Sequence, residues 1–140
     1  MDYKNILQRM HQQFQSMPNM SFQPPAQPDA IRRFEAASHI TLPTAFRQWL
    51  EISDGGELFL PGGVQLYGAA HKPLLDPSDR IDGSGVIIGR MAFGDPIIFQ
   101  EGSETVAIYN QEAGRIEPDE VFDDFCVFLW ELKQTLGIGG

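Results

Sequence analysis

The sequence predicts an α+β fold, with a central, mostly antiparallel sheet of about five to six strands packed by helices. Two observations support this prediction. Apolar residues recur at helical spacing up to about residue 53 and again from about 121 to 136, whereas the segments between alternate with the period of a strand. The strand-like segments are joined by short turns, which favour antiparallel pairing because parallel strands need long crossovers.

The N-terminal part of the chain predicts two helices with an extended connector between them. The first helix spans about residues 2–15, and its apolar stripe consists of Tyr3, Ile6, Leu7, Met10 and Phe14. Residues 16–28 are rich in proline and lack a period, so we expect a connector that lies across the domain surface. A second helix is expected from Asp29 to about His39, with Ile31 and Phe34 facing inward.

The stretch LPTAFRQWLEISDGG, residues 42–56, predicts a third, short helix. Pro43 suits the first helical turn, and either Gly55 or Gly56 can adopt the left-handed conformation that ends a helix. The other glycine then lets the backbone pass close to a neighbouring segment. We therefore expect structural roles for both glycines rather than ligand binding.

The middle of the chain predicts the sheet. Five segments have the pattern of strands: 57–60, 64–68, 86–94, 96–101 and 105–110. A short edge strand is expected at 114–118, and a loop is expected at 71–85.

The C-terminal part predicts the last helix, from about residue 121 to 136. It is apolar on most sides, so we expect it to pack against both the sheet and another helix. Asp119 and Glu120 suit its positive N-terminal end, and the neighbouring pair Asp123 and Asp124 has the same use there.

Length and composition predict one soluble globular domain. The 140 residues are 42% hydrophobic and 21% charged. We divide them into an N-terminal helix (1–15), the connector (16–28) and a core (29–137). No apolar run approaches the roughly 20 residues that a membrane-spanning helix needs, and the polar start lacks the apolar centre of a signal peptide. We therefore expect a cytoplasmic protein.

A search for catalytic and metal-binding residues finds no convincing constellation. Three histidines lack the spacing of metal-ligand pairs: His11, His39 and His71. Three aspartates recur at every third position, not at the alternate positions of a calcium loop: Asp76, Asp79 and Asp82. Cys126, the single cysteine, stands among bulky apolar residues and is interpreted as a buried thiol. We predict a protein without enzymatic activity, cofactor or bound metal.

The net charge of -9 is distributed unevenly. From Asp95 to Glu131 the chain has ten acidic residues and one basic residue, Arg115. Such a surface repels nucleic-acid phosphates and attracts a basic protein. Taken alone, the charge favours the alternative that it only keeps the protein soluble. As the candidate protein-binding residues we name Glu112, Glu117, Asp119 and Glu120.

The order of the motifs resembles the SUKH superfamily, which includes fungal regulators of cell-wall assembly and many bacterial immunity proteins. The resemblance covers roughly residues 28–136. The first half of the pattern, from a helix to a Gly-Gly pair, is carried by Ile31, Glu35, Leu42, Pro43, Phe46, Trp49, Leu50, Asp54, Gly55 and Gly56. The second half, a Gly-Asp turn and a closing helix, is carried by Gly94, Asp95, Phe122 and Phe125. Asp54 stands where the family usually has asparagine. Aspartate can support a turn in the same way as asparagine.

The resemblance implies an α+β fold and a protein-binding role. Its bacterial branch implies an immunity protein that neutralises a toxin domain, often a nuclease, so the implied partner is a cognate and basic toxin domain. Its fungal branch implies a regulatory or scaffold module that binds a cellular partner. An enzyme or small-ligand protein with a pocket beside the Gly94-Asp95 turn is the third alternative. The sequence leaves the partner and the oligomeric state open.

Overall fold

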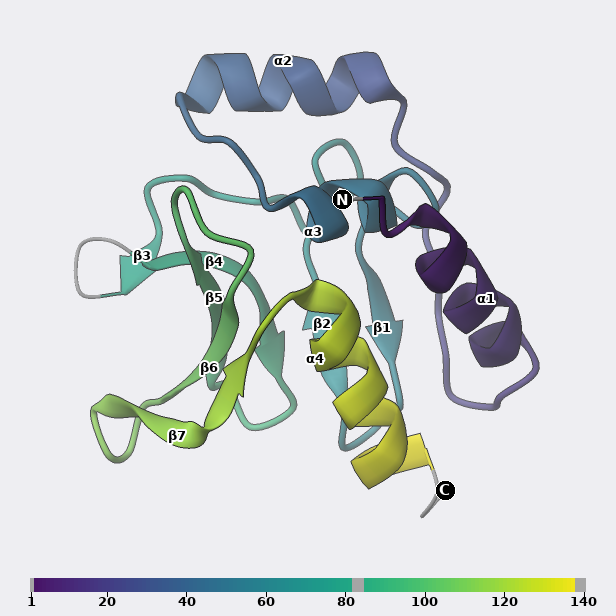
Figure 1. Cartoon of the computed structure of the whole chain (residues 1–140), viewed down its shortest axis with the longest axis vertical. Coiled ribbons are helices and arrows are strands. Elements are labelled where there is room, and N and C mark those ends of the chain that lie inside the picture. Colours follow the sequence, from purple (N-terminus) through teal and green to yellow (C-terminus); the bar gives the residue numbers. More distant parts are fainter. Residues whose placement is uncertain (1, 82–84, 138–140) are drawn as a thin grey trace.

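Seven antiparallel strands form one sheet in the computed structural model, which describes residues 2–81 and 85–137 (Figure 1). The strands are β1 (Gly56–Leu58), β2 (Val64–Leu66), β3 (Arg80–Ile81), β4 (Gly85–Met91), β5 (Pro96–Gln100), β6 (Val106–Asn110) and β7 (Arg115–Phe122). Their order in the sheet is β1-β2-β4-β5-β6-β7, and β3 pairs with the start of β4. The α+β prediction is therefore confirmed. Strand β3 lies inside the segment 71–85, which was expected to be a loop. Asp82 of the same segment lies outside the described residues.

The helices carry the apolar stripes that the sequence predicts, with one exception. They are α1 (Lys4–Gln15), α2 (Pro28–Ser38), α3 (Thr44–Leu50) and α4 (Phe125–Leu132), and a π-helical turn (Lys133–Gly137) follows α4. Tyr3, Leu7, Met10 and Phe14 are buried, but Ile6 is half exposed, so its assignment to the buried stripe is wrong. The position of Ile6 lies at the edge of the stripe, where the helix turns toward solvent.

The main core lies between the helices and one face of the sheet. Helix α3 packs between α1 and α4, and these three helices lie together in Figure 1, with α2 at one end of the molecule. Trp49 and Phe46 of α3 are fully buried. The Phe46 and Phe125 rings pack edge to face, with their centroids 5.1 Å apart. The opposite sheet face has its own smaller apolar cluster, formed by Ile87, Ile98 and Ala107. Because both faces are covered, the central strands are apolar at most positions.

The boundary between β7 and α4 differs from the sequence prediction. Val121 and Phe122 pair with Ala107 and Val106 of β6, so they end a strand instead of beginning a helix. Helix α4 begins at Phe125, and Asp124 caps it by accepting a hydrogen bond from Val127 N at 2.9 Å. The capping role expected for the Asp123-Asp124 pair is thus carried by Asp124.

Asp119 and Glu120 do not lie at the N-terminal end of α4, which corrects the second part of that prediction. They belong to β7, an eight-residue strand where only a short edge strand was expected. The apolar residues of this segment alone fit either a strand or a helix. Its pairing with β6 makes it a strand.

The two glycines after α3 have a different role from a helix cap. Helix α3 ends at Leu50 with Glu51 in a right-handed conformation, whereas Gly55 and Gly56 lie further on with φ of 96° and 124°. A Cβ atom on Gly55 would lie 2.6 Å from the carbonyl oxygen of Leu66. The structural role is therefore a close approach of two backbones at the start of the sheet.

The connector follows the edge of β1 and the end of α3. Ser21 pairs with Glu57 in both backbone directions, at 2.8 and 2.7 Å. Ala26 N donates to the carbonyl oxygen of Leu50 at 2.8 Å. The Ser21–Glu57 hydrogen bonds occupy the outer edge of β1. The other edge of the sheet is β7.

Candidate protein-binding surface

A groove opens where the β4–β5 turn, β7 and α4 meet. We call it the α4 groove, and its volume is about 400 Å³. Its apolar lining includes Met91, Phe122, Phe128 and Leu132. Phe128 and Leu132 point inward from α4 and are buried, so they form its floor. Because these side chains also belong to the main core, the floor is held rigidly.

Four carboxylates line the same groove: Asp95, Asp119, Glu120 and Glu131. None of the described residues that line it is basic. Partial burial raises the pKa of Glu120 above its ordinary value, and Asp119, Asp95 and Glu117 raise it further. The negative charges therefore stand close enough to disfavour one another.

Phe93 forms a ridge between the α4 groove and a second hollow. The second hollow, of about 420 Å³, is lined by Phe93, Asp95, Asn110, Gln111 and Glu112. Phe93 and Asp95 line both hollows, and the Phe93 side chain is 78% exposed at the tip of the β4–β5 turn. An aromatic side chain in this position contributes little to the core and is available for contact with another molecule.

Three of the four acidic residues named from the sequence line these hollows. Asp119 and Glu120 line the α4 groove, and Glu112 lines the second hollow. Glu117 lines neither, and its carboxylate lies 3.2 Å from Nε of Arg115. The sequence reasoning missed Phe93, and it considered Asp95 only as a turn residue and as part of a small-ligand pocket, not as part of a protein-binding surface. The signal for Phe93 was a large aromatic residue directly before the predicted Gly-Asp turn.

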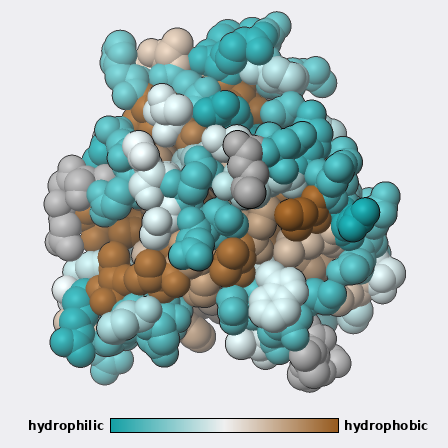
Figure 2. All heavy atoms as spheres, in the orientation of Figure 1, coloured by the Kyte–Doolittle hydropathy of each residue, from teal (hydrophilic) through white to brown (hydrophobic). Residues whose placement is uncertain are grey.

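Exposed apolar side chains also lie on β7 and α4, close in the chain to the groove residues. Trp130 is half exposed, and Val121 and Val127 are partly exposed. Figure 2 shows hydrophobic side chains over the region of β7 and α4 among hydrophilic ones. Exposed apolar side chains that gather in this way mark a candidate surface for contact with another molecule.

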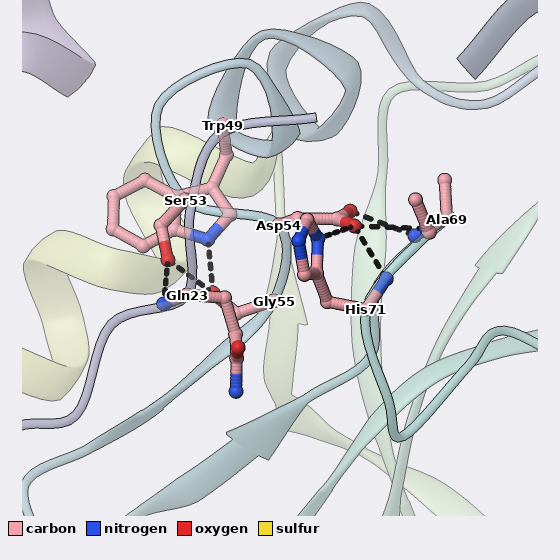
Figure 3. A network of polar contacts seen from close by, with 8 residues as sticks. Gln23, Trp49, Ser53, Asp54, Gly55, Ala69 and His71 are labelled. Carbon is pink, nitrogen blue, oxygen red and sulfur yellow. Dashed lines mark hydrogen bonds and ion pairs between the residues drawn. The ribbon is translucent and has the colours of Figure 1, made fainter. Parts of the chain in front are cut away.

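A buried polar network lies at the start of the sheet (Figure 3), and its residues do not line the α4 groove. The Asp54 carboxylate is only 1% exposed and accepts hydrogen bonds from the backbone N–H groups of Ala69, Ala70 and His71 at 2.7–2.8 Å. It also lies 2.8 Å from Nδ1 of His71. Asp54 therefore ties the segment after β2 to the turn before β1, and it does more than support its own turn.

The neighbouring residues complete this network. Ser53 Oγ donates to the carbonyl oxygen of Gly55 at 2.9 Å and accepts from Gln23 N at 3.1 Å. Nε1 of Trp49 donates to the same carbonyl at 3.1 Å. The network satisfies buried polar groups and joins three segments of the chain, which is a structural role.

The described part of the chain contains neither a cluster of side chains that could hold a metal ion nor a membrane-spanning helix. Within residues 2–81 and 85–137, no three histidine, cysteine or acidic side chains come together to hold a metal ion. No helix in this part of the chain has the length and apolar character to cross a membrane. Cys126 is buried, and burial raises the pKa of its thiol to about 12.

The decisive comparison is with the model of the SMI1 / KNR4 family (SUKH-1), which matches residues 25–131. The chain belongs to the SMI1 / KNR4 family (SUKH-1). A comparison with curated proteins finds none that matches. The SUKH-1 match includes the β4–β5 turn, β7 and most of α4, and it does not include α1.

The residues that carried the SUKH resemblance lie mostly in the core and its hydrogen bonds. Fully or nearly fully buried are Ile31, Leu42, Phe46, Trp49, Leu50 and Phe125. Glu35 Oε2 accepts from Leu42 N at 2.8 Å and lies 3.4 Å from Nε of Arg47. Pro43 precedes the first residue of α3, and Gly94 adopts φ 98° in the β4–β5 turn. Of this set, Asp95 and Phe122 line the α4 groove, so only they are shared with the candidate binding surface.

Proposed function

We propose that this SUKH-1 protein is a non-enzymatic, cytoplasmic immunity-type binder that neutralises a toxin domain by covering its active site. The observation that supports the proposal best is the α4 groove. Four carboxylates surround its rigid apolar floor, and none of the described lining residues is basic. A toxin domain that acts on nucleic acid has a basic surface, and an acidic protein occupies that surface in place of phosphates. The SUKH family membership supports binding to a protein partner.

Binding of this kind depends on electrostatic attraction during the encounter. The net charge of -9 raises the rate of association with a basic domain, and salt screens this effect over about 10 Å at 0.1 M ionic strength. Shape and apolar contacts then determine how long the complex lasts. The charged residues of β7 therefore act mainly on the association rate.

The proposal is tested by co-expressing the chain with the toxin domain encoded beside it. We expect a stable complex and protection of the cells. The triple variant Glu117→Lys, Asp119→Lys and Glu120→Lys should slow association without unfolding the protein. A variant with Glu101→Lys, at the far end of β5, provides a single charge reversal away from the groove. Neither complex nor protection, or association rates that are equal at low and high salt, would contradict the proposal.

A regulatory or scaffold role is the alternative that the fungal branch of the family implies. It predicts a complex with a cellular protein and no protection against a toxin. The co-expression experiment separates the two functions because only an immunity protein protects.

Recognition of a small molecule is a second candidate function at the same groove. It is favoured by one observation, the raised pKa of Glu120 beside Asp95. An enzyme uses such carboxylates in a site that excludes water, whereas Phe93 and Asp119 are exposed here. Protein binding therefore explains the groove better. Saturable calorimetric binding of a small polyamine such as spermidine, with an affinity unchanged by salt, would favour the small-molecule function.

A further inference from the structure

We infer that Phe93 and the two hollows beside it form a docking surface for an arginine-bearing segment of a basic protein. In this arrangement two arginine side chains straddle the exposed Phe93 ring, and each guanidinium group stacks on the ring and meets the carboxylates of its own hollow. This inference rests on the proposed protein-binding function and names the site and the side-chain chemistry that it recognises.

The turn between β4 and β5 holds Phe93 in an outward position. Met91 N donates to the carbonyl oxygen of Asp95, and Gly94 N donates to that of Met91, both at 2.9 Å. Gly94 has φ 98°, which glycine adopts without strain. On its other side, Nη1 of Arg90 donates to the carbonyl oxygen of Gly94 at 3.1 Å. Because the turn is fixed in this way, Phe93 loses little conformational freedom when a partner binds.

Asp95 is positioned at the base of the Phe93 ridge. Its Oδ1 atom accepts a hydrogen bond from Gln111 N at 3.1 Å, which links the β4–β5 turn to the turn after β6. Its Oδ2 atom has no hydrogen-bond partner among the described residues. One oxygen therefore fixes the carboxylate, and the other is available to a donor from a partner.

The other groove carboxylates are likewise without a cationic partner in the part of the chain that the structure describes. Among the described residues, the side-chain carboxylates of Asp119, Glu120 and Glu131 accept no hydrogen bond and form no ion pair; the hydrogen bond from Thr135 to Glu131 reaches its backbone carbonyl. The nearest arginines in the sequence are used elsewhere, since Arg90 Nη2 lies 3.5 Å from Asp79 and Arg115 pairs with Glu117. Partial burial raises the pKa of Glu120, and the nearby charges of Asp119, Asp95 and Glu117 raise it further, so a cation supplied by a partner relieves this repulsion.

The lining chemistry favours arginine over other cationic side chains. Its aliphatic stem suits the apolar floor at Phe122 and Leu132, and its planar head suits both an aromatic ring and a pair of carboxylate oxygens. Lysine offers the charge without the planar stacking group. Because Phe93 separates two hollows with carboxylates in each, the surface fits two cationic side chains that straddle the ring.

The test uses the ¹⁵N-labelled full chain and three acetylated, amidated tripeptides: Arg-Gly-Arg, Lys-Gly-Lys and citrulline-Gly-citrulline. NMR titration should show saturable shifts at the backbone amides of Phe93, Gly94, Asp95 and Glu120 with the arginine peptide. The lysine peptide should bind more weakly, and the neutral citrulline peptide should not bind. Shifts that are equal for arginine and citrulline, or that spread evenly over all surface carboxylates, would overturn the inference.

Matched variants locate the contact. Phe93→Ala should lower the affinity for the arginine peptide about two- to fivefold, as expected for loss of an exposed cation–π contact. Asp95→Asn should weaken it as well. The controls are Leu74→Ala, another exposed apolar residue, and Glu101→Gln, at the opposite end of β5 from Asp95; both should leave the affinity unchanged. If a folded Phe93→Ala variant bound the arginine peptide with unaltered affinity, Phe93 would not be part of the docking surface.

Failure of this inference is distinguishable from failure of the proposed function. Protection against the toxin that persists in Phe93→Ala and Asp95→Asn would leave the immunity function in place and refute this docking surface. Arginine-peptide binding at Phe93 without protection would support the surface and refute the immunity function.

Discussion

Nδ1 of His71 lies 2.8 Å from the carboxylate of Asp54, although 17 positions separate the two residues in the chain. The same carboxylate accepts the backbone N–H groups of residues 69–71. The aspartate of the Asp-Gly-Gly motif is thus the point where the end of α3, the start of the sheet and the segment after β2 are joined.

Removal of the Asp54 carboxylate should destabilise the fold strongly. Asp54→Ala leaves three backbone donors without their acceptor, and we expect a loss of about 2–4 kcal/mol in the free energy of unfolding. Urea denaturation measures this loss. As a control, His71→Ala removes one partly exposed partner and should cost about 1 kcal/mol or less. Equal losses in the two variants would show that the backbone hydrogen bonds are not the main contribution.

Substitution of Gly55 should reduce stability rather than partner binding. Gly55→Ala places a methyl group 2.6 Å from the carbonyl oxygen of Leu66 in a backbone conformation with φ 96°. We expect a loss of about 2 kcal/mol or more. Gly62→Ala is the matched control, because a Cβ atom there meets nothing within 4 Å. The same reasoning applies to Gly55→Val and Gly56→Val. Loss of binding in a fully stable Gly55 variant would contradict a purely structural role.

Glu104, which lies between β5 and β6 in the chain, should stabilise the beginning of α3. Its two carboxylate oxygens accept from Thr44 N at 2.7 Å and Ala45 N at 3.1 Å. Glu104→Ala should therefore cost about 1–2 kcal/mol, as for the loss of a helix cap. The exposed carboxylate of Glu101 is a suitable comparison, and Glu101→Ala should cost no more than about 1 kcal/mol. Thermal unfolding of both variants would show whether the difference exists.

Neutralising Glu120 should make the protein more stable at neutral pH. Burial and the nearby Asp119, Asp95 and Glu117 raise the pKa of Glu120 in the folded state above that in the unfolded chain. The folded state therefore binds the proton more tightly, and stability falls as pH rises from the unfolded value toward the raised one. Glu120→Gln should raise the melting temperature at pH 7, and its advantage should disappear below about pH 4. A lower melting temperature of Glu120→Gln at pH 7 would argue against the crowding of charges in the groove.

Cys126 should be inert in the folded protein. Burial, followed by the effects of Asp124 and Glu104, raises the pKa of its thiol to about 12, so very little thiolate is present at neutral pH. A thiol reagent should react with it at pH 7.5 only after denaturation. Rapid modification of the native protein would indicate that α4 opens easily.

Much of the fold follows from local patterns in the sequence. The apolar stripe of α1, the inward residues of α3 and the short apolar segments of β4, β5 and β6 are local signals that do not depend on distant partners. The burial of Cys126 follows in the same way from its apolar neighbours. The end of β7 did not follow, because the apolar spacing around Val121 and Phe122 fits a helix or a strand until β6 is paired beside it.

The candidate surface depends on the tertiary structure to a greater extent. The sequence by itself determined the excess of acidic residues between Asp95 and Glu131 and the family to which the chain belongs. Only the folded chain decided that Asp95 faces the same groove as Glu120, that Glu117 lies outside it, and that Phe93 is exposed between two hollows. The physical reason is that charge and apolar spacing are local properties of the chain. The grouping of distant side chains is set by strand register and by the packing of α4 against the sheet.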